Sequence, residues 1–178
     1  MSRELWLLRH GKADRNMAME DFDRPLKKRG KRAAEQIGVW LHDQRLIPDW
    51  IASSPAKRAI STAKIVQKAL AVDGLGITQD KRLYQEGLER LKLVLAECPL
   101  EARRVLLVGH NPELEDLLIH LAGADNLPDT DKLLPTAALA RLIMPDDWTH
   151  LEAGCASLLS ITSPKSLPDE AANLSWDR

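Results

Sequence analysis

The chain has 178 residues, a net charge of -1 at neutral pH and a pI near 6.5. This balance gives no electrostatic reason to expect a nucleic acid partner, and the length suits a single domain with a substantial core. Cys98 and Cys155 stand far apart, and no apolar run approaches the ~20 residues that cross a bilayer. We therefore expect a reduced, soluble, cytoplasmic protein that does not contact a membrane.

The first predicted element is a short apolar strand over residues 5–8 that ends in Arg9, His10 and Gly11. An apolar run closed by a glycine is typical of a buried strand that leads into a tight turn. In an open α/β sheet the ligand binds at the carboxyl ends of the strands, so we expect these side chains to line a pocket. Gly11 would let the backbone approach a ligand closely, and the polar residues 12–24 predict a loop over the site.

A helix is predicted over residues 26–45, because apolar side chains recur there at helical spacing. Its expected buried face consists of Ala33, Ala34, Ile37, Trp40 and Leu41. The basic run of residues 27–32 lies at its start and has two interpretations. We favour a solvated first turn and outer helix face, and the alternative is a docking patch for an acidic protein.

A second strand over residues 49–53 and a helix over residues 56–71 follow. Ser54 is predicted to cap this helix and Pro55 to occupy its first position. Arg58 then falls in the first turn, beside the free N–H groups of a helix N-terminus. This is a favourable place for an anion.

The third and fourth strands are predicted over residues 76–79 and 104–108, with a helix over residues 88–98 between them. The fourth strand runs into Gly109 and His110. Asn111 is predicted to cap the next helix and Pro112 to start it.

Two further strands, over residues 137–144 and 157–161, are separated by a turn and predict an antiparallel edge. The alternation of strands and helices predicts a three-layer α/β/α fold with a mostly parallel central sheet. We expect residues 1–164 to form the domain and residues 165–178 to form a loose tail.

Three strand–helix junctions supply side chains suited to a phosphoryl group: Arg9 with His10, Arg58, and His110 with Asn111. The planar guanidinium groups match phosphate oxygens, and helix N-termini add N–H donors. A neutral imidazole can act as a nucleophile at physiological pH, so His10 is the candidate nucleophile.

Together these residues resemble the histidine phosphatase superfamily, which has a phosphoglycerate mutase-like fold. The resemblance rests on Arg9-His10-Gly11, on Ser54-Pro55 with Arg58, and on Gly109-His110-Asn111-Pro112. More narrowly, the chain resembles the SixA-type phosphohistidine phosphatase branch over residues 4–165. The features typical of that branch are Lys12-Ala13, residues 21–26, Pro135-Thr136, Trp148 and Pro164-Lys165.

The resemblance implies that His10 is transiently phosphorylated and that Arg9, Arg58 and His110 bind the phosphoryl oxygens, with Gly11 and Asn111 also contacting the substrate. It further implies two successive displacements without a metal or another cofactor. The implied partner is a protein phosphorylated on histidine, of the histidine phosphotransfer type. The alternatives are a phosphatase of small phosphorylated metabolites and a non-catalytic phosphoprotein-binding module.

The sequence offers no strong candidate for the general acid that would protonate a leaving alkoxide. The compact branch usually carries an acidic residue where this chain has Gln85, which leaves Glu86 as the candidate acid. The alternative for Glu86 is an exposed loop carboxylate, and Asp14 and Asp21 are weaker candidates. A site with a poor acid should favour phosphohistidine over alkyl phosphates, because the P–N bond is more labile and its imidazole can already carry a proton.

Overall fold

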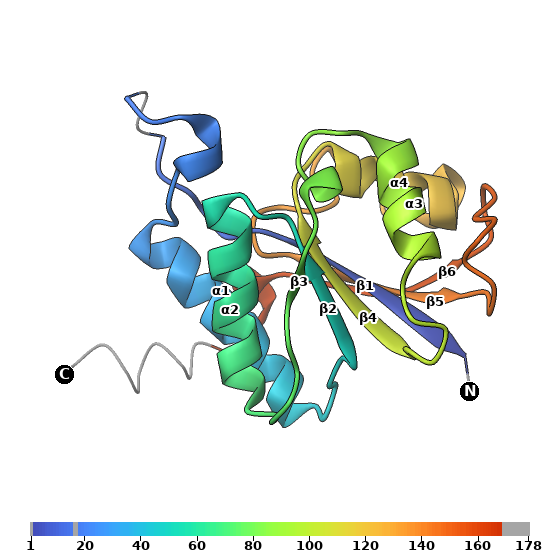
Figure 1. Cartoon of the computed structure of the whole chain (residues 1–178), viewed down its shortest axis with the longest axis horizontal. Coiled ribbons are helices and arrows are strands. Elements are labelled where there is room, and N and C mark those ends of the chain that lie inside the picture. Colours follow the sequence, from blue (N-terminus) through green and yellow to red (C-terminus); the bar gives the residue numbers. More distant parts are fainter. Residues whose placement is uncertain (1, 16–17, 169–178) are drawn as a thin grey trace.

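The computed structural model describes residues 2–15 and 18–168 and is built on one six-stranded sheet (Figure 1). The strands are β1 (Arg3–Arg9), β2 (Trp50–Ser53), β3 (Thr78–Gln79), β4 (Arg104–Gly109), β5 (Leu139–Met144) and β6 (Ser157–Thr162). They lie in the order β3-β2-β4-β1-β5-β6. The first four of these are parallel, whereas β5 runs antiparallel to β1 and β6 antiparallel to β5. The predicted mostly parallel sheet with an antiparallel edge is confirmed.

Helices cover both faces of the sheet. α1 (Lys28–Asp43) and α2 (Lys57–Leu70) lie together on one face, and α3 (Leu88–Ala96) and α4 (Glu113–Ala122) lie on the other (Figure 1). Four short 3-10 turns complete the described elements: η1 (Asp21–Asp23), η2 (Lys81–Leu83), η3 (Ala124–Asn126) and η4 (Pro164–Ser166). The predicted three-layer α/β/α architecture is therefore confirmed.

The sequence of β1 is apolar at successive positions because the strand is covered on both sides. Trp6 and Leu8 pack in the cluster under α1 and α2, whereas Leu5 and Leu7 pack in the cluster under α3 and α4. All four side chains are fully buried. This central position fixes the carboxyl end of β1, where the predicted site begins.

The buried face of α1 differs in part from the predicted one. Ala34, Ile37 and Leu41 are buried as expected, but Ala33 and Trp40 are only half-buried. Two glycines, at positions 30 and 38, complete the buried stripe. Because glycine has no apolar side chain, the spacing of apolar side chains predicts a stripe centred slightly off the face that contacts the sheet.

Strand β5 begins at Leu139, later than predicted, because Ala137 adopts a left-handed conformation with φ of 60°. Its backbone N–H reaches the carbonyl oxygens of Arg9 and His10, at 3.1 and 3.0 Å. The residues before β5 therefore support the carboxyl end of β1 instead of extending the strand.

The described part of the C-terminal segment lies against α1. Gln36 Nε2 donates to the carbonyl oxygen of Pro164 at 3.1 Å, and Leu167 packs against the cluster under α1 and α2. The rest of the predicted tail, residues 169–178, lies outside the described residues, and the division into domain and tail stays a prediction. No helix in the described ranges is long and apolar enough to cross a membrane.

Candidate active site

The predicted site residues meet where three neighbouring parallel strands end. β1 ends at Arg9 and is followed by His10, while β4 ends at Gly109 and is followed by His110. Arg9 pairs with Gly109 across the two strands, so the two histidines lie side by side with ring centroids 5.1 Å apart. β2, on the other side of β4, leads into α2, which carries Arg58 in its first turn.

His10 is held in one tautomer by the backbone. Its Nδ1 lies 2.7 Å from the carbonyl oxygen of Gly11, and because a carbonyl only accepts, we assign the proton to Nδ1 and the lone pair to Nε2. Burial lowers the pKa of His10 to about 4, with repulsion from Arg58 and Arg9 adding to the effect and the Gly11 hydrogen bond opposing it. The imidazole is therefore neutral at physiological pH, and its Nε2 is available as a nucleophile.

The turn after His10 is clamped between α1 and α2. The Gly11 N–H donates to Thr62 Oγ1 at 3.0 Å, and the Thr62 hydroxyl donates to the carbonyl oxygen of Arg58 at 2.7 Å. A Cβ atom on Gly11 would lie only 2.5 Å from the carbonyl oxygen of Gly30 in α1. Gly11 is therefore required by the contact with α1, in addition to any approach of a ligand.

The imidazole of His110 is neutral and offers one N–H group as a hydrogen-bond donor. Its Nε2 lies 2.8 Å from Ser54 Oγ, which already accepts the N–H of Ala56 at 3.2 Å. We assign the Ser54 hydrogen to the bond with Nε2 and the His110 proton to Nδ1, which makes Nδ1 an N–H donor. Burial, with repulsion from His10 next, lowers the pKa of His110 to about 3.

The prediction that Ser54 and Asn111 cap α2 and α4 is wrong. The N-cap positions are Ala56 and Pro112, and neither supplies a side-chain cap. The two predicted caps have tertiary partners instead: Ser54 is bound to the imidazole at the end of β4, and Asn111 Nδ2 donates to the carbonyl oxygen of Leu134 at 2.9 Å. Their hydrogen bonds position the site instead of terminating a helix.

Arg9 shares its anchor with Asn111. Its Nη1 also donates to the carbonyl oxygen of Leu134, at 3.1 Å. Burial lowers the pKa of Arg9, and the nearby carboxylate of Glu115 opposes this shift. An arginine keeps its proton under such conditions, so Arg9 places a fixed positive charge beside the imidazole that follows it.

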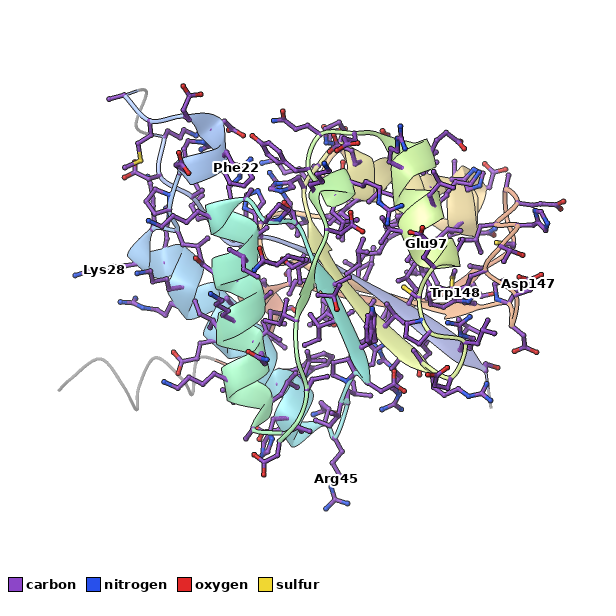
Figure 2. All side chains as sticks on the ribbon, viewed as in Figure 1. Phe22, Lys28, Arg45, Glu97, Asp147 and Trp148 are labelled. Carbon is purple, nitrogen blue, oxygen red and sulfur yellow. The ribbon has the colours of Figure 1, made fainter. Side chains whose placement is uncertain are left out.

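Arg58 is almost fully buried and is held by Asp21 of η1. Its Nη1 donates to the backbone carbonyl of Asp21 at 2.7 Å, and its Nη2 donates to the Asp21 carboxylate at 3.0 Å. Phe22, from the same short turn, stacks edge-on with Tyr84 at 5.3 Å and lies near the N-terminal end of α2 (Figure 2). The part of the predicted loop that forms η1 therefore folds back onto the site.

The Asp21 carboxylate accepts several further hydrogen bonds. Tyr84 Oη and Gln85 Nε2 donate to Oδ2, and Arg24 donates to Oδ1. The hydrogen bond from Tyr84 is the largest cause that lowers the pKa of Asp21 to about 2, and the bond and charge of Arg58 add to it. Asp21 is thus a carboxylate at neutral pH. Sequence reasoning gave Tyr84 no role, because its contact with Asp21 spans 63 positions and leaves no local pattern.

The structure does not bring Glu86 into this cluster. Its carboxylate faces Arg90 at 3.9 Å, and its side chain is 38% exposed. The preceding Gln85 has φ of 57° and directs its amide to Asp21. The exposed-carboxylate alternative therefore describes the geometry of Glu86 better than the role of an acid.

Unpaired buried polar atoms are concentrated in this cluster. Of the seven such side-chain atoms within the described residues, four belong to predicted site residues: Arg9 Nε, Arg58 Nε, His110 Nδ1 and Asn111 Oδ1. Three of these are N–H donors, and a buried donor without a partner is costly. Two of these donors belong to guanidinium groups and the third to an imidazole, a combination that suits an oxyanion that accepts several hydrogen bonds, such as a phosphoryl group.

Comparison with known proteins agrees with this geometry. The family model of the histidine phosphatase superfamily (branch 1) matches residues 5–85. A structure proposed to be the phosphohistidine phosphatase SixA of Agrobacterium tumefaciens is 32% identical, with a TM-score of 0.75 and 92% of this chain and 99% of that chain covered. Its counterpart from Nakamurella multipartitia is 26% identical, with a TM-score of 0.77 and 92% and 97% covered. An uncharacterized protein of Mycobacterium tuberculosis (strain H37Rv) is 29% identical over 167 residues, which are 89% of this chain and 100% of that protein.

Proposed function

The chain belongs to the histidine phosphatase superfamily, and on that premise we propose that it removes the phosphoryl group from phosphohistidine on a protein, through an intermediate on His10. The observation that carries the proposal is the state of His10. Its imidazole is buried and neutral, and its Nδ1 proton is bound to the Gly11 carbonyl, which leaves Nε2 as the nucleophile.

In the first displacement, His10 Nε2 attacks phosphorus while the P–N bond to the substrate imidazole breaks. Arg9 and Arg58 hold the phosphoryl oxygens and neutralise their charge, and His110 donates its Nδ1 hydrogen to one of them. The Gly11 carbonyl stabilises the positive charge that forms on the His10 ring. The substrate histidine departs as a neutral imidazole if it enters with a proton on its second nitrogen.

In the second displacement, water attacks phosphorus and the P–N bond to His10 breaks. The electron pair returns to Nε2, and the water proton passes to the released phosphate. Because the same residues hold the oxygens in both steps, catalysis rests on positioning and charge stabilisation. The proposal involves no metal ion.

The carboxylates support phosphohistidine rather than an alkyl phosphate as the substrate. Asp21 is ionised at neutral pH, since its pKa is about 2, and Glu86 faces Arg90. Asp21 therefore carries no proton for a departing alkoxide, and Glu86 is directed to Arg90. An alkoxide is a poor leaving group without a proton. An imidazole needs less help, because it can already be protonated.

The test measures phosphate release from a phosphohistidine-bearing carrier domain, from p-nitrophenyl phosphate and from an alkyl phosphate. His10→Ala is the test variant, and His150→Ala, which changes an exposed loop histidine, is its control. We expect rapid release from the carrier and little from the alkyl ester, with all activity lost in His10→Ala alone. Acid-labile phosphate trapped on the protein should also disappear in that variant.

Two results would replace the proposal. Faster turnover of the alkyl ester than of the carrier would reveal a working acid and assign the protein to small phosphorylated metabolites. No turnover of any of the three, together with binding of the phosphorylated carrier, would make it a phosphoprotein-binding module.

A further inference from the structure

The N-terminal end of α1 carries a dense group of cations that the proposed reaction does not use. Six of the nine residues from 24 to 32 are basic and none is acidic, although the whole chain has a net charge of -1. Lys27 is the N-cap of α1, and Lys28, Arg29 and Lys31 in its first turn are exposed. Lys28 projects away from the molecule at this end of the helix (Figure 2).

This placement does not help the helix. The N-terminus of a helix carries a partial positive charge, so cations there are repelled and carboxylates are favoured. The first turn of α1 contains no acidic residue. Within the described part of the chain, none of Lys27, Lys28, Arg29 and Lys31 has a carboxylate at ion-pair distance. Neither the helix nor an ion pair with a described residue accounts for these four cations.

A close backbone contact brings these cations to the active site. The N–H of Lys27 donates to the carbonyl oxygen of Lys12 at 2.8 Å, and a Cβ on Gly30 would lie 2.1 Å from that same oxygen. Lys12 follows His10 by two positions, so the start of α1 is packed against the turn that holds the nucleophile.

The charges at this contact repel one another. Repulsion from Arg15 is the largest cause of a lowered pKa at Lys12, and Arg29 and Lys27 add to it. A cluster of like charges with no internal counter-ion is relieved when an acidic surface covers it. The position beside His10 means that such a surface would belong to the molecule whose phosphoryl group enters the site.

We propose that Lys12, Lys27, Lys28, Arg29 and Lys31, here called the basic surface, dock an acidic face of the phosphorylated protein next to its phosphohistidine. This inference rests on the proposed function and extends it, because it specifies that the partner protein presents an acidic face. A protein fits better than a nucleic acid, because the chain as a whole is slightly negative and would repel a long polyanion beyond this one face.

Two double variants with matched spacing test the basic surface. Lys27→Glu/Lys31→Glu reverses two charges on it, and Lys64→Glu/Lys68→Glu reverses two exposed lysines four residues apart on α2. The substrates are two phosphohistidine peptides of equal length, one flanked by Asp and Glu and the other by Asn and Gln, and phosphoramidate as a small substrate. The first variant places carboxylates at the start of α1, so we expect its Tm to be unchanged or higher.

We expect wild type to prefer the acidic peptide by about tenfold in kcat/KM at low ionic strength, and this preference should shrink as salt is added. Lys27→Glu/Lys31→Glu should lose or invert the preference, whereas Lys64→Glu/Lys68→Glu should keep it. Phosphoramidate hydrolysis should change less than about twofold in either variant, because Lys27 and Lys31 are proposed to contact the docked protein and not the phosphoryl group.

Equal rates on the two peptides in wild type, or an equal loss in both double variants, would overturn the docking proposal while leaving the phosphatase proposal intact. Tighter binding of a single-stranded oligonucleotide than of the acidic peptide would also overturn it. If phosphoramidate and both peptides resist hydrolysis, the proposed function fails. Anisotropy titration with the unphosphorylated acidic peptide then decides separately whether the basic surface binds acidic chains.

Discussion

Asp21 places a negative charge next to a guanidinium that is proposed to hold a phosphoryl group. Its backbone carbonyl and its carboxylate bind the two Nη atoms of Arg58, so one residue orients the fork and also lowers its positive field. These two effects oppose each other when a phosphoryl dianion arrives. An amide at this position keeps the backbone contact with Arg58 and removes the negative charge, and it also replaces one of the two accepting oxygens with an N–H donor.

We therefore expect Asp21→Asn to bind inorganic phosphate about three- to tenfold more tightly than wild type, because repulsion between the carboxylate and the dianion is removed. The measurement is competitive inhibition by phosphate at neutral pH with p-nitrophenyl phosphate as the substrate. Asp23→Asn, in the same short turn, is the matched control. Weaker phosphate binding in Asp21→Asn would mean that the carboxylate acts mainly to hold Arg58.

The leaving-group dependence of the rate tests both carboxylates as acids. For a series of aryl phosphates we expect the rate to fall steeply as the leaving-group pKa rises, with the same slope in wild type, Asp21→Asn and Glu86→Gln. The reason is that Asp21 is ionised and Glu86 faces Arg90, so neither supplies a proton. A flat slope in wild type that becomes steep in one variant would identify that residue as the acid.

At the scale of the elements, the sequence predicted the strands and helices whose positions depend on a local pattern of apolar residues. The apolar run over residues 5–8 and the glycine after it correctly predicted a buried strand at this place, although β1 extends from Arg3 to Arg9. The same reasoning located His110 after β4. The capping roles of Ser54 and Asn111 were wrong, because a side-chain oxygen or amide that can cap a helix can equally bind a tertiary partner. The Asp21 contacts were not predictable, because they depend on how an irregular loop folds back.

The contact between α1 and the turn after β1 allows a prediction about packing. A Cβ at Gly30 would meet the Lys12 carbonyl oxygen at 2.1 Å and the Lys12 nitrogen at 2.7 Å, both of them backbone atoms that cannot rotate away. Gly30→Ala should therefore push α1 away from the turn that follows His10. We expect the unfolding free energy to fall by about 2 kcal/mol and most of the phosphatase activity to be lost.

Gly76→Ala is the control for this change, because nothing lies within 4 Å of the added atom and Gly76 lies outside left-handed backbone space. Urea unfolding and turnover of p-nitrophenyl phosphate should show the effect in Gly30→Ala alone. A Gly30→Ala variant with the stability and activity of wild type would show that α1 can shift without disturbing His10.

On the scale of the whole molecule, the fold places two neutral histidines and two charged arginines at one edge of an apolar sheet. His10 and His110 are both nearly inaccessible to solvent, and their pKa values are lowered mainly by burial. The same burial that keeps the proposed nucleophile unprotonated must weaken the folded state in acid. Activity and stability are thus coupled through the same two side chains.

The sign of this coupling follows from proton uptake. The pKa values of about 4 and about 3 in the folded chain lie below the ordinary histidine value, so between about pH 6.5 and 4 the unfolded chain binds protons that the folded chain does not. Above about pH 6.5 both histidines are neutral in the folded and the unfolded chain, and the unfolding free energy is at its full value. It decreases as the pH falls below that point. For each histidine the loss at pH 5 is about 2 kcal/mol. The Asp21 carboxylate, with its pKa of about 2, stays ionised throughout this window.

We expect the unfolding free energy of wild type to fall between pH 7 and pH 5 by about 2 kcal/mol more than that of His10→Ala, which retains only His110 of the two buried active-site histidines. Urea titrations of the two proteins at both pH values measure the difference, with His150→Ala as the exposed-histidine control. Because folded His10 stays neutral at pH 5, kcat/KM should persist there in whatever fraction remains folded, and should fall only near pH 4. Equal losses of stability in wild type and His10→Ala would show that His10 is protonated in the folded protein at pH 5, and kcat/KM would then decline together with stability.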